Sequence, residues 1–272
     1  MPKFIDLTAR LKEGMIQNHY NHPRAPLLWS SQRHDITQYD FVQRWTSEDR
    51  PPLFDGLPVE AGQWGKGHGW ASEQFILGGH CGTHMDAGAH FDHRDTAQYV
   101  QDIPIEKCYG EAIILDLRER CSENYPITIT DLEEAEKKTG DKVKKGDIVV
   151  IHTGWAARWV YGAKPDRWKY HEEYPGLAYE SPIWFIEREI KLVGVDTPNL
   201  DCDEVLSAHI NFLLRPWINK EPIQIVENLV NLEKIPRVRF IFMGFPLPIE
   251  GSTGSPIRAV ALIPDRGSDE KR

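Results

Sequence analysis

Three histidines and an aspartate fall within eleven residues of segment 80–91, which reads His-Cys-Gly-Thr-His-Met-Asp-Ala-Gly-Ala-His-Phe, and few backbone conformations let them act together. A helix would bring His80 and His84 to one face but would turn Asp86 away from them. A straight strand would place all of them on one face, yet four extended residues span about 13 Å, too far for His80 and His84 to share one ion. We therefore expect an extended segment with a bend, and Gly82 is where a bend costs least because glycine has no Cβ.

The residue types in this segment predict a metal site. Imidazole and carboxylate are ligands that borderline divalent metals prefer. A single buried histidine is usually a hydrogen-bonded core residue, but here the polar residues alternate with glycine, threonine and alanine rather than with large apolar side chains. The segment cannot complete such a site alone, so at least one further ligand is expected from elsewhere in the chain.

The composition excludes several classes of partner. With 272 residues and a net charge of −9, the chain can form a large core and is too acidic for nucleic acid or an anionic membrane to be its main partner. No apolar run approaches the roughly 20 residues that cross a bilayer, and the amino terminus has no apolar stretch of signal-peptide length. The four cysteines form no C-x-x-C pair, which argues against a zinc knuckle or a disulfide framework. A cytoplasmic location is therefore expected.

Apolar runs between glycines and prolines predict a sheet of buried strands. The expected strands are 112–117, 148–153, 192–196, 223–226 and 238–245. One helix is expected from the capping-box spacing of Thr130 and Glu133 to about Gly140, and another from Ser181-Pro182 to about Ile190. Because strands outnumber helices, the expected fold class is α/β or α+β with a substantial sheet.

Residues 20–75 differ in composition from the rest of the chain. They contain five prolines and four tryptophans. A long irregular segment of this kind is often a lid or a subunit contact, although its tryptophans would equally fill gaps in a core. The charged residues 265–272 are expected to form a loose tail.

Segment 80–91 resembles the signature H-x-G-T-H-x-D-x-P-x-H-F of the cyclase family of metal-dependent hydrolases, which includes bacterial kynurenine formamidase and isatin hydrolase. It departs from the signature at Gly88, where the family usually has proline. Further segments are similar to family elements in the same order: Ile-Asp-Leu-Thr at 5–8, the G-D-x-V-L-x-x-T-G-W strand at 146–155, the G-I-D-x-P-S-x-D turn at 193–201, the E-N-L element at 227–229 and the closing segment at 246–259. The resemblance covers nearly the whole chain, which implies a single domain over residues 1–272.

The resemblance implies a ligand set. His80, His84 and Asp86 match the metal ligands of the signature, and His209 and Glu227 match the distal pair that completes the site in formamidase-like members. A lone glutamate in an apolar strand fits such a role, because a buried carboxylate without a partner is costly. One or two divalent ions are implied, and the donor set leaves zinc and manganese both open.

His90 matches the proposed catalytic histidine of the family. An imidazole exchanges protons near neutral pH, so the resemblance implies that His90, with Glu227, delivers a proton to the leaving group. The alternative is that His90 is a further ligand or hydrogen-bonds to one. Gly88 is expected to loosen the backbone and to shift His90. Residues 215–220 lengthen the interval between the distal pair, which makes the position of His209 harder to assign than that of Glu227.

The implied fold is a swivelling β/β/α arrangement with a barrel-like mixed sheet, assembled as a homodimer or homotetramer. The implied activity is hydrolysis of an amide C–N bond in a small molecule, either a formamide or a lactam-like ring. An aromatic substrate would suit the tryptophan-rich segment. The alternatives are ring closure or dehydration of a small carbonyl compound at the same site, and a non-catalytic protein that binds a metal or a ligand. His152 and Trp155 are further candidates for the pocket, whereas Asp196 and Asp201 are expected to stabilise a turn through local amides.

Overall fold

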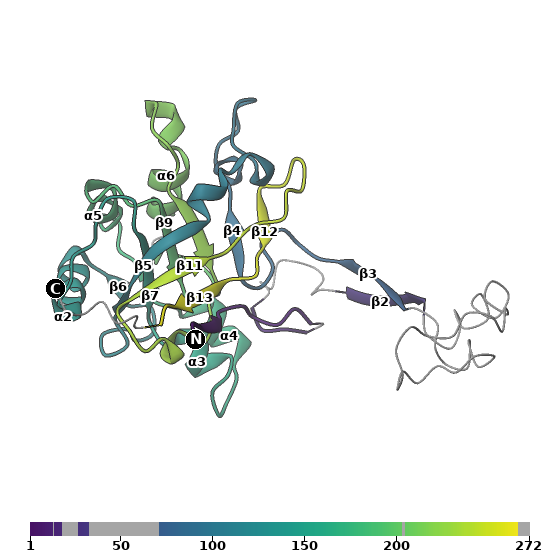
Figure 1. Cartoon of the computed structure of the whole chain (residues 1–272), viewed down its shortest axis with the longest axis horizontal. Helices are drawn as coiled ribbons and strands as arrows, with labels where there is room; N and C mark the ends of the chain where they lie inside the picture. Colours follow the sequence, from purple (N-terminus) through teal and green to yellow (C-terminus); the bar gives the residue numbers. More distant parts are fainter. Residues whose placement is uncertain (13, 18–26, 33–70, 203–204, 266–272) are drawn as a thin grey trace, which may run out of the picture. The chain divides into compact units, whose positions relative to one another are not determined.

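The computed structural model describes residues 1–12, 14–17, 27–32, 71–202 and 205–265 (Figure 1). The chain divides into two compact units, residues 26–77 and the remainder. In the smaller unit, β2 (Leu27–Gln32) pairs antiparallel with β3 (Ser72–Ile76), and the register shifts between Ser30 and Gln32. Most of the predicted lid or subunit-contact segment 20–75 lies outside the described residues, as does the tail after Asp265.

The larger unit contains a nine-stranded mixed sheet that curls into a half-barrel, in the order β1-β13-β11-β5-β7-β9-β10-β4-β12. Four central strands, β5, β7, β9 and β10, are parallel, and the flanking strands pair antiparallel. The strands are β1 (Lys3–Asp6), β4 (His84–Asp86), β5 (Tyr109–Asp116), β7 (Ile148–His152), β9 (Leu192–Val195), β10 (Gln224–Glu227), β11 (Arg239–Met243), β12 (Gly254–Pro256) and β13 (Val260–Ile263). A short parallel pair, β6 (Pro126–Ile127) and β8 (Gly176–Leu177), lies outside this sheet. The predicted fold class, with its barrel-like mixed sheet, is confirmed.

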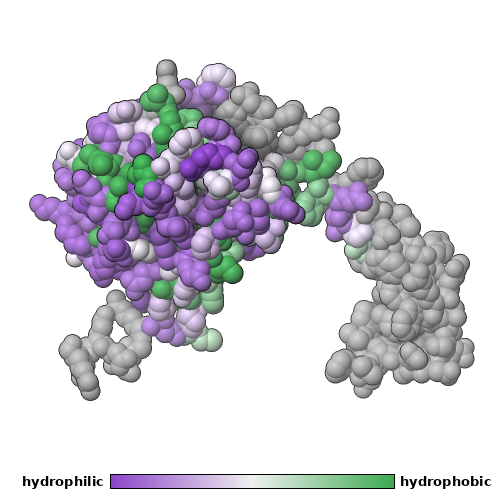
Figure 2. Space-filling model, turned by 90° about the horizontal axis from the view of Figure 1, so that it is seen from above, coloured by the Kyte–Doolittle hydropathy of each residue, from purple (hydrophilic) through white to green (hydrophobic). Residues whose placement is uncertain are grey.

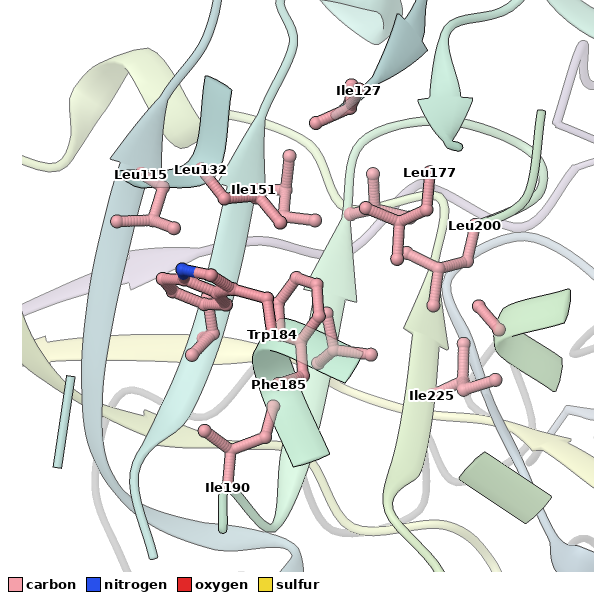
Figure 3. Close-up of a cluster of buried hydrophobic side chains, with 14 of the residues drawn as sticks. Leu115, Ile127, Leu132, Ile151, Leu177, Trp184, Phe185, Ile190, Leu200 and Ile225 are labelled. Carbon is pink, nitrogen blue, oxygen red and sulfur yellow. The ribbon is translucent and has the colours of Figure 1, made fainter. Parts of the chain in front are cut away.

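All five predicted strands are present, with bounds that differ by one to three residues at most ends. Every residue of β7, β9 and β10 is buried, because apolar side chains cover both faces of the parallel strands. On one face, Trp184 and Phe185 pack beside Leu115 and Ile151 in the cluster that Figure 3 shows. These strands form the rigid base on which the polar residues at their ends are placed.

The helices and 3₁₀ turns connect strands along the chain. They are α2 (Ile129–Thr139), α3 (Trp155–Trp159), α4 (Arg167–Glu172), α5 (Pro182–Glu187) and α6 (Ser207–Leu213), with 3₁₀ turns η1 (Gly88–His90), η2 (Val100–Asp102), η3 (Ile105–Lys107), η4 (Arg215–Ile218) and η5 (Leu232–Lys234). No helix in the described part of the chain is long and apolar enough to cross a bilayer. The face shown in Figure 2 is largely hydrophilic, with apolar side chains gathered in a few separate groups.

Two helix boundaries correct the predictions. The capping box of α2 is formed by Thr128 and Asp131, two residues earlier than predicted, and the helix ends at Gly140 in a left-handed conformation. Pro182 is the first residue of α5, as predicted, but α5 ends at Glu187 rather than near Ile190. The early end has a local reason, because Glu189 takes a positive φ of 50° and so leaves the helical region.

Candidate metal centre

Segment 80–91 bends at Gly82 and then continues as the short strand β4. Gly82 has φ +61°, and a Cβ there would come within 2.9 Å of the Leu11 side chain, so glycine is required by both conformation and space. Thr83 fixes the bend, since its hydroxyl donates to the Asn228 carbonyl (2.6 Å) and accepts from the Ala9 amide (2.8 Å). The predicted bend is confirmed, but the extended conformation is limited to β4, because residues 88–90 form the 3₁₀ turn η1.

β4 lies between β10 and β12, and this pairing brings distant residues together. His84 is the register partner of Glu227 on β10, and Asp86 is opposite Gly254 on β12. A Cβ on Gly254 would lie 2.4 Å from the His80 ring, so this glycine leaves the space that the ring fills. The His84 ring and the Asp86 carboxylate from β4 therefore meet the Glu227 carboxylate from β10 at one end of the sheet.

The potential ligands form two groups that share Asp86. Ligand atoms of His80, His84 and Asp86 all lie within 4.8 Å of one another, and so do those of Asp86, His90 and His209. Asp86 Oδ2 is buried and has no hydrogen-bond partner among the described residues, while lying 3.5 Å from His209 Nε2. A buried carboxylate oxygen without a donor is costly, and a cation compensates it.

The rings of His84 and His209 are oriented in the way that metal ligands require. His84 Nδ1 donates to the Gly82 carbonyl (2.9 Å), and His209 Nδ1 donates to the Asp201 carboxylate (2.6 Å). Because a carbonyl and a carboxylate only accept, the proton resides on Nδ1 in both rings, and Nε2 faces the centre. His84 Nε2 lies 3.4 Å from Asp86 Oδ1, at ligand-to-ligand spacing.

His80 differs from these two rings. Its Nδ1 donates to Asp86 Oδ1 (2.7 Å), and its Nε2 accepts from the Thr253 hydroxyl (3.1 Å). Both nitrogens are thus engaged, and His80 must exchange one of these bonds to ligate an ion. Thr253 carries no signal in the sequence, because it is separated from His80 by most of the chain.

His209 lies on α6 and is placed by Asp201. The Asp201 carboxylate accepts from the backbone amides of Ala208 and His209 at the start of the helix (2.5 and 3.1 Å) as well as from the His209 ring. Sequence reasoning assigned Asp201 to a turn and missed its contact with the imidazole. Residues 215–220 follow α6 and form η4, so they lengthen the connection without moving His209 out of the centre.

Glu227 is buried and faces the centre, but belongs to neither group of three. Its Oε2 lies 3.5 Å from His84 Nε2, its Oε1 lies 3.5 Å from His209 Nε2, and Oε1 also accepts from the Leu200 amide (2.9 Å). The structure therefore brings together all six sequence-predicted site residues, with Glu227 between the two inward-facing imidazoles.

His90 is exposed, whereas His84, Asp86 and His209 are buried. Its ring centroid lies 4.1 Å from that of His80 and 6.0 Å from that of His209, and within the described residues its ring nitrogens make no hydrogen bond. Partial burial of the ring lowers the pKa of His90, and the neighbouring imidazoles of His80, His209 and His84 lower it further, although Asp86 opposes this change. The ring is therefore neutral at pH 7 and free to exchange a proton.

The electrostatics of the buried residues fit a divalent cation. Burial would lower the pKa of His84, but Asp86 and Glu227 outweigh it and raise that pKa to about 9. The same carboxylates, with Asp201, raise the pKa of His209 well above its ordinary value against the effect of burial. Burial alone would raise the pKa of Asp86, but the surrounding imidazoles outweigh burial and hold that pKa well below its ordinary range. The buried carboxylates thus hold protons on the imidazoles, and a cation would replace those protons.

Three other candidates lie elsewhere. His152 lines a separate cavity, and Trp155 is fully buried in a small apolar cluster. Asp196 accepts from the amides of Thr153 and Gly154, at 2.8 Å each, rather than from the local amides that the sequence favoured. The parallel pairing of β7 with β9 explains this, since it aligns the ends of both strands.

Comparisons with known proteins agree with this geometry. Residues 5–202 match the model of the Cyclase family, which is described as "Putative cyclase". The chain is similar to isatin hydrolase from Roseibium aggregatum, with 26% identity over 197 residues that cover 70% of this chain and 73% of the relative. It is also similar to kynurenine formamidase from Erythrobacter litoralis, with 25% identity over 236 residues that cover 85% of this chain and 88% of the relative.

Solved structures share the fold. Isatin hydrolase A from Labrenzia aggregata, bound to benzyl benzoate, superimposes with a TM-score of 0.72 at 18% identity and covers 96% of this chain and 94% of its own. The crystal structure of a novel cyclase superimposes with a TM-score of 0.71 at 22% identity and covers 96% of this chain and 88% of its own. At such identities the likeness concerns the fold alone, and it confirms the fold that the resemblance implied.

Proposed function

The chain belongs to the Cyclase family, and from this premise and the geometry of the centre we propose that it is a metal-dependent hydrolase that cleaves an amide C–N bond of a small molecule. The observation that carries the proposal is the sharing of Asp86 between two groups of potential ligands, beside an exposed and uncommitted His90. Buried ligands on one side and an accessible proton carrier on the other are what metal-assisted hydrolysis needs.

In this proposal His80, His84, Asp86, His209 and Glu227 hold one or two divalent ions, zinc or manganese. Such an ion lowers the pKa of a water molecule toward neutrality and polarises a carbonyl group. The fixed Nδ1–H tautomers of His84 and His209 keep Nε2 pointed at the ion, as the partners of metal-bound imidazoles commonly do.

His90 would deliver a proton to the departing nitrogen. It is the most exposed imidazole of the cluster, and none of its described neighbours occupies a ring nitrogen by a hydrogen bond. Glu227 would assist it and keep the neighbouring imidazoles in place. The alternative role of His90, as a ligand in the group with Asp86 and His209, is the outcome that a metal analysis of His90→Ala would reveal.

The proposed substrate is a formamide or a cyclic amide, because the relatives named above include kynurenine formamidase and isatin hydrolase. An aromatic group is favoured by Phe91, whose ring centroid lies 5.0 Å from that of His90 and 5.1 Å from that of His209. An apolar ring placed beside both imidazoles gives a flat substrate a surface to pack on.

The test combines metal analysis with product analysis. Protein purified without added metal should contain zinc or manganese, and it should hydrolyse members of a panel of aryl formamides and lactams. In H₂¹⁸O the new carboxylate should carry solvent oxygen. Ring closure or dehydration without incorporation of solvent oxygen would support the cyclase alternative, and inertness of the metal-loaded protein toward the whole panel would reject an amide hydrolase.

Two further expectations are part of this proposal. The protein is proposed to act in the cytoplasm, which the scattered spacing of its four cysteines, without a C-x-x-C pair, supports, and to assemble as a homodimer or homotetramer. Sedimentation of the metal-loaded protein at micromolar concentration tests the assembly, and a monomer would contradict it. Neither nucleic acid nor a membrane is proposed as a partner.

A further inference from the structure

A second cavity, of about 740 Å³, opens at the carboxyl ends of the parallel strands β5 and β7. Its floor includes Asp116 and His152, the last residues of these strands and register partners in the sheet. Its walls are the carboxyl-terminal half of α2 and the segment 232–238. None of the described residues that line it belongs to the metal centre. Crevices at the carboxyl ends of parallel strands are common ligand sites, and this volume suits a small molecule.

His152 is the buried polar group of this cavity. Its side chain is 3% exposed, and within the described chain neither ring nitrogen has a hydrogen-bond partner. The adjacent Asp116 carboxylate is already held by Arg118 at 2.6 Å. Its ring nitrogens are not among the fully enclosed polar atoms, so a polar group of a ligand in the cavity can hydrogen-bond to the ring.

Four of the charged side chains around the cavity form ion pairs with described residues, and two others do not. Asp116 pairs with Arg118, and Glu119 pairs with Lys138 at 3.3 Å. Among the described residues, Glu233 and Arg237 form no ion pair, and Arg237 donates one hydrogen bond to the Pro264 carbonyl at 3.2 Å. One negative and one positive side chain, four positions apart, are therefore not part of an ion pair among the described residues, although the charge of Glu233 also acts on Arg118.

The surface between these charges is apolar. Ile114 on β5 and Ile235 are only partly buried, and Ile235 lies between Glu233 and Arg237 in the sequence of the same wall. A nucleotide is disfavoured, because its phosphates would face Glu119 and Glu233. A ligand that fits has an apolar body and carries both a positive and a negative group.

We propose that this cavity binds a small α-amino acid with an apolar or aromatic side chain. Arg237 receives the carboxylate, Glu233 receives the ammonium group, and the apolar side chain lies on Ile114 and Ile235 beside the His152 ring. This site is separate from the metal centre, and the inference does not depend on the reaction proposed there.

Calorimetric titration of the full-length, metal-loaded protein with L-phenylalanine tests the site. Saturable binding is expected, and phenethylamine and 3-phenylpropionate, which each lack one charge, should bind at least roughly 10-fold more weakly. Arg237→Gln and Glu233→Gln should each weaken L-phenylalanine binding about 10-fold. Arg258→Gln is the matched control, because Arg258 is exposed, pairs with Asp6 and lies outside the cavity.

Asp86→Asn distinguishes this cavity from the metal centre. Binding of L-phenylalanine should survive that substitution, because the two sites share no described residue. Loss of binding in Asp86→Asn would place the amino acid at the metal centre and overturn the proposal. No saturable binding at concentrations on the order of 10 mM, or equal binding of either analogue, would overturn it as well.

Discussion

The metal centre and the second cavity contain histidines of equal burial and different surroundings. His84, His209 and His152 are each 3% exposed. At the metal centre, each ring has one nitrogen fixed by an acceptor while the other faces carboxylates 3.4 to 3.5 Å away. In the cavity, the His152 ring has no hydrogen bond among the described residues. Burial alone therefore does not indicate a metal ligand, whereas a fixed far nitrogen together with carboxylates that face the near nitrogen is the arrangement expected of one.

His90 combines features of both regions. It lies in the metal centre by distance, yet its ring nitrogens lack hydrogen-bond partners as those of His152 do. A ligand imidazole is normally held by a second partner on its other nitrogen. The comparison thus supports the proposed division, in which His84 and His209 hold an ion and His90 transfers a proton.

Asp86→Asn should have the largest effect. Its carboxylate belongs to both ligand groups, so the substitution removes the charge that compensates the surrounding imidazoles. We expect loss of bound metal and a fall in hydrolysis greater than the roughly 10–100-fold that loss of an outer partner costs. Elemental analysis and initial rates measure both. Full metal content in this variant would show that Asp86 is not the shared ligand.

His90→Ala should separate proton transfer from metal binding. We expect normal metal content with turnover reduced roughly 10²–10⁴-fold, as for loss of a general acid or base. His93→Ala is the control, since His93 is also exposed but contacts the Trp217 ring, with centroids 5.7 Å apart. Joint loss of metal and activity in His90→Ala would make His90 a ligand.

Asp201→Asn should weaken metal binding by roughly 10–100-fold, because Asp201 fixes the tautomer and orientation of His209. Asp196→Asn is the matched control. Asp196 is equally buried at the same end of the sheet, but it accepts hydrogen bonds from Thr153 and Gly154 and contacts no imidazole among the described residues. Metal affinity measured by competition with a chelator should fall in the first variant only. An equal fall in both would mean that Asp201 acts through stability alone.

The central sheet could be predicted because its strands are buried on both faces. Runs such as 148–153 and 192–196 carry no polar side chain before their last one or two residues, and they appear as β7 and β9 with nearly the same ends. The short strands β4 and β12 carry no such signal, because β12 reads Gly-Ser-Pro and β4 reads His-Met-Asp. β4 is a strand because β10 offers an edge to pair with, and β12 is a strand because β4 offers the next edge, and a local pattern does not show either.

The site residues also divide into those with a local sequence signal and those without one. The density of histidines in segment 80–91 is a local signal, so His80, His84, Asp86 and His90 could be predicted from it. His209 and Glu227 were assigned through the family resemblance, and the register of β10 against β4 supplies the physical reason for Glu227. Asp201 and Thr253 could not be found, because their roles arise only from folding over long separations.

Gly88→Pro tests whether the backbone can hold His90, whose ring nitrogens have no hydrogen-bond partner among the described residues. Gly88 begins η1 without a positive φ, and a Cβ there would meet Gln98 at an ordinary 3.4 Å. Ala87 before it is extended, with φ −98° and ψ 163°, which is the conformation that a following proline favours. The substitution should therefore stabilise the protein by roughly 0.4–1 kcal/mol through the unfolded state, measured by urea unfolding.

Gly254→Ala is the opposing control for Gly88→Pro, because a Cβ at Gly254 would lie 2.4 Å from the His80 ring and should displace it. We expect Gly88→Pro to retain metal and turnover and Gly254→Ala to lose both. If Gly88→Pro kept its metal but lost turnover, His90 would need freedom in η1 that proline removes, and glycine at this position would be part of how the ring reaches its substrate. If the two variants behaved alike, the backbone at residue 88 would carry strain that its dihedral angles do not indicate.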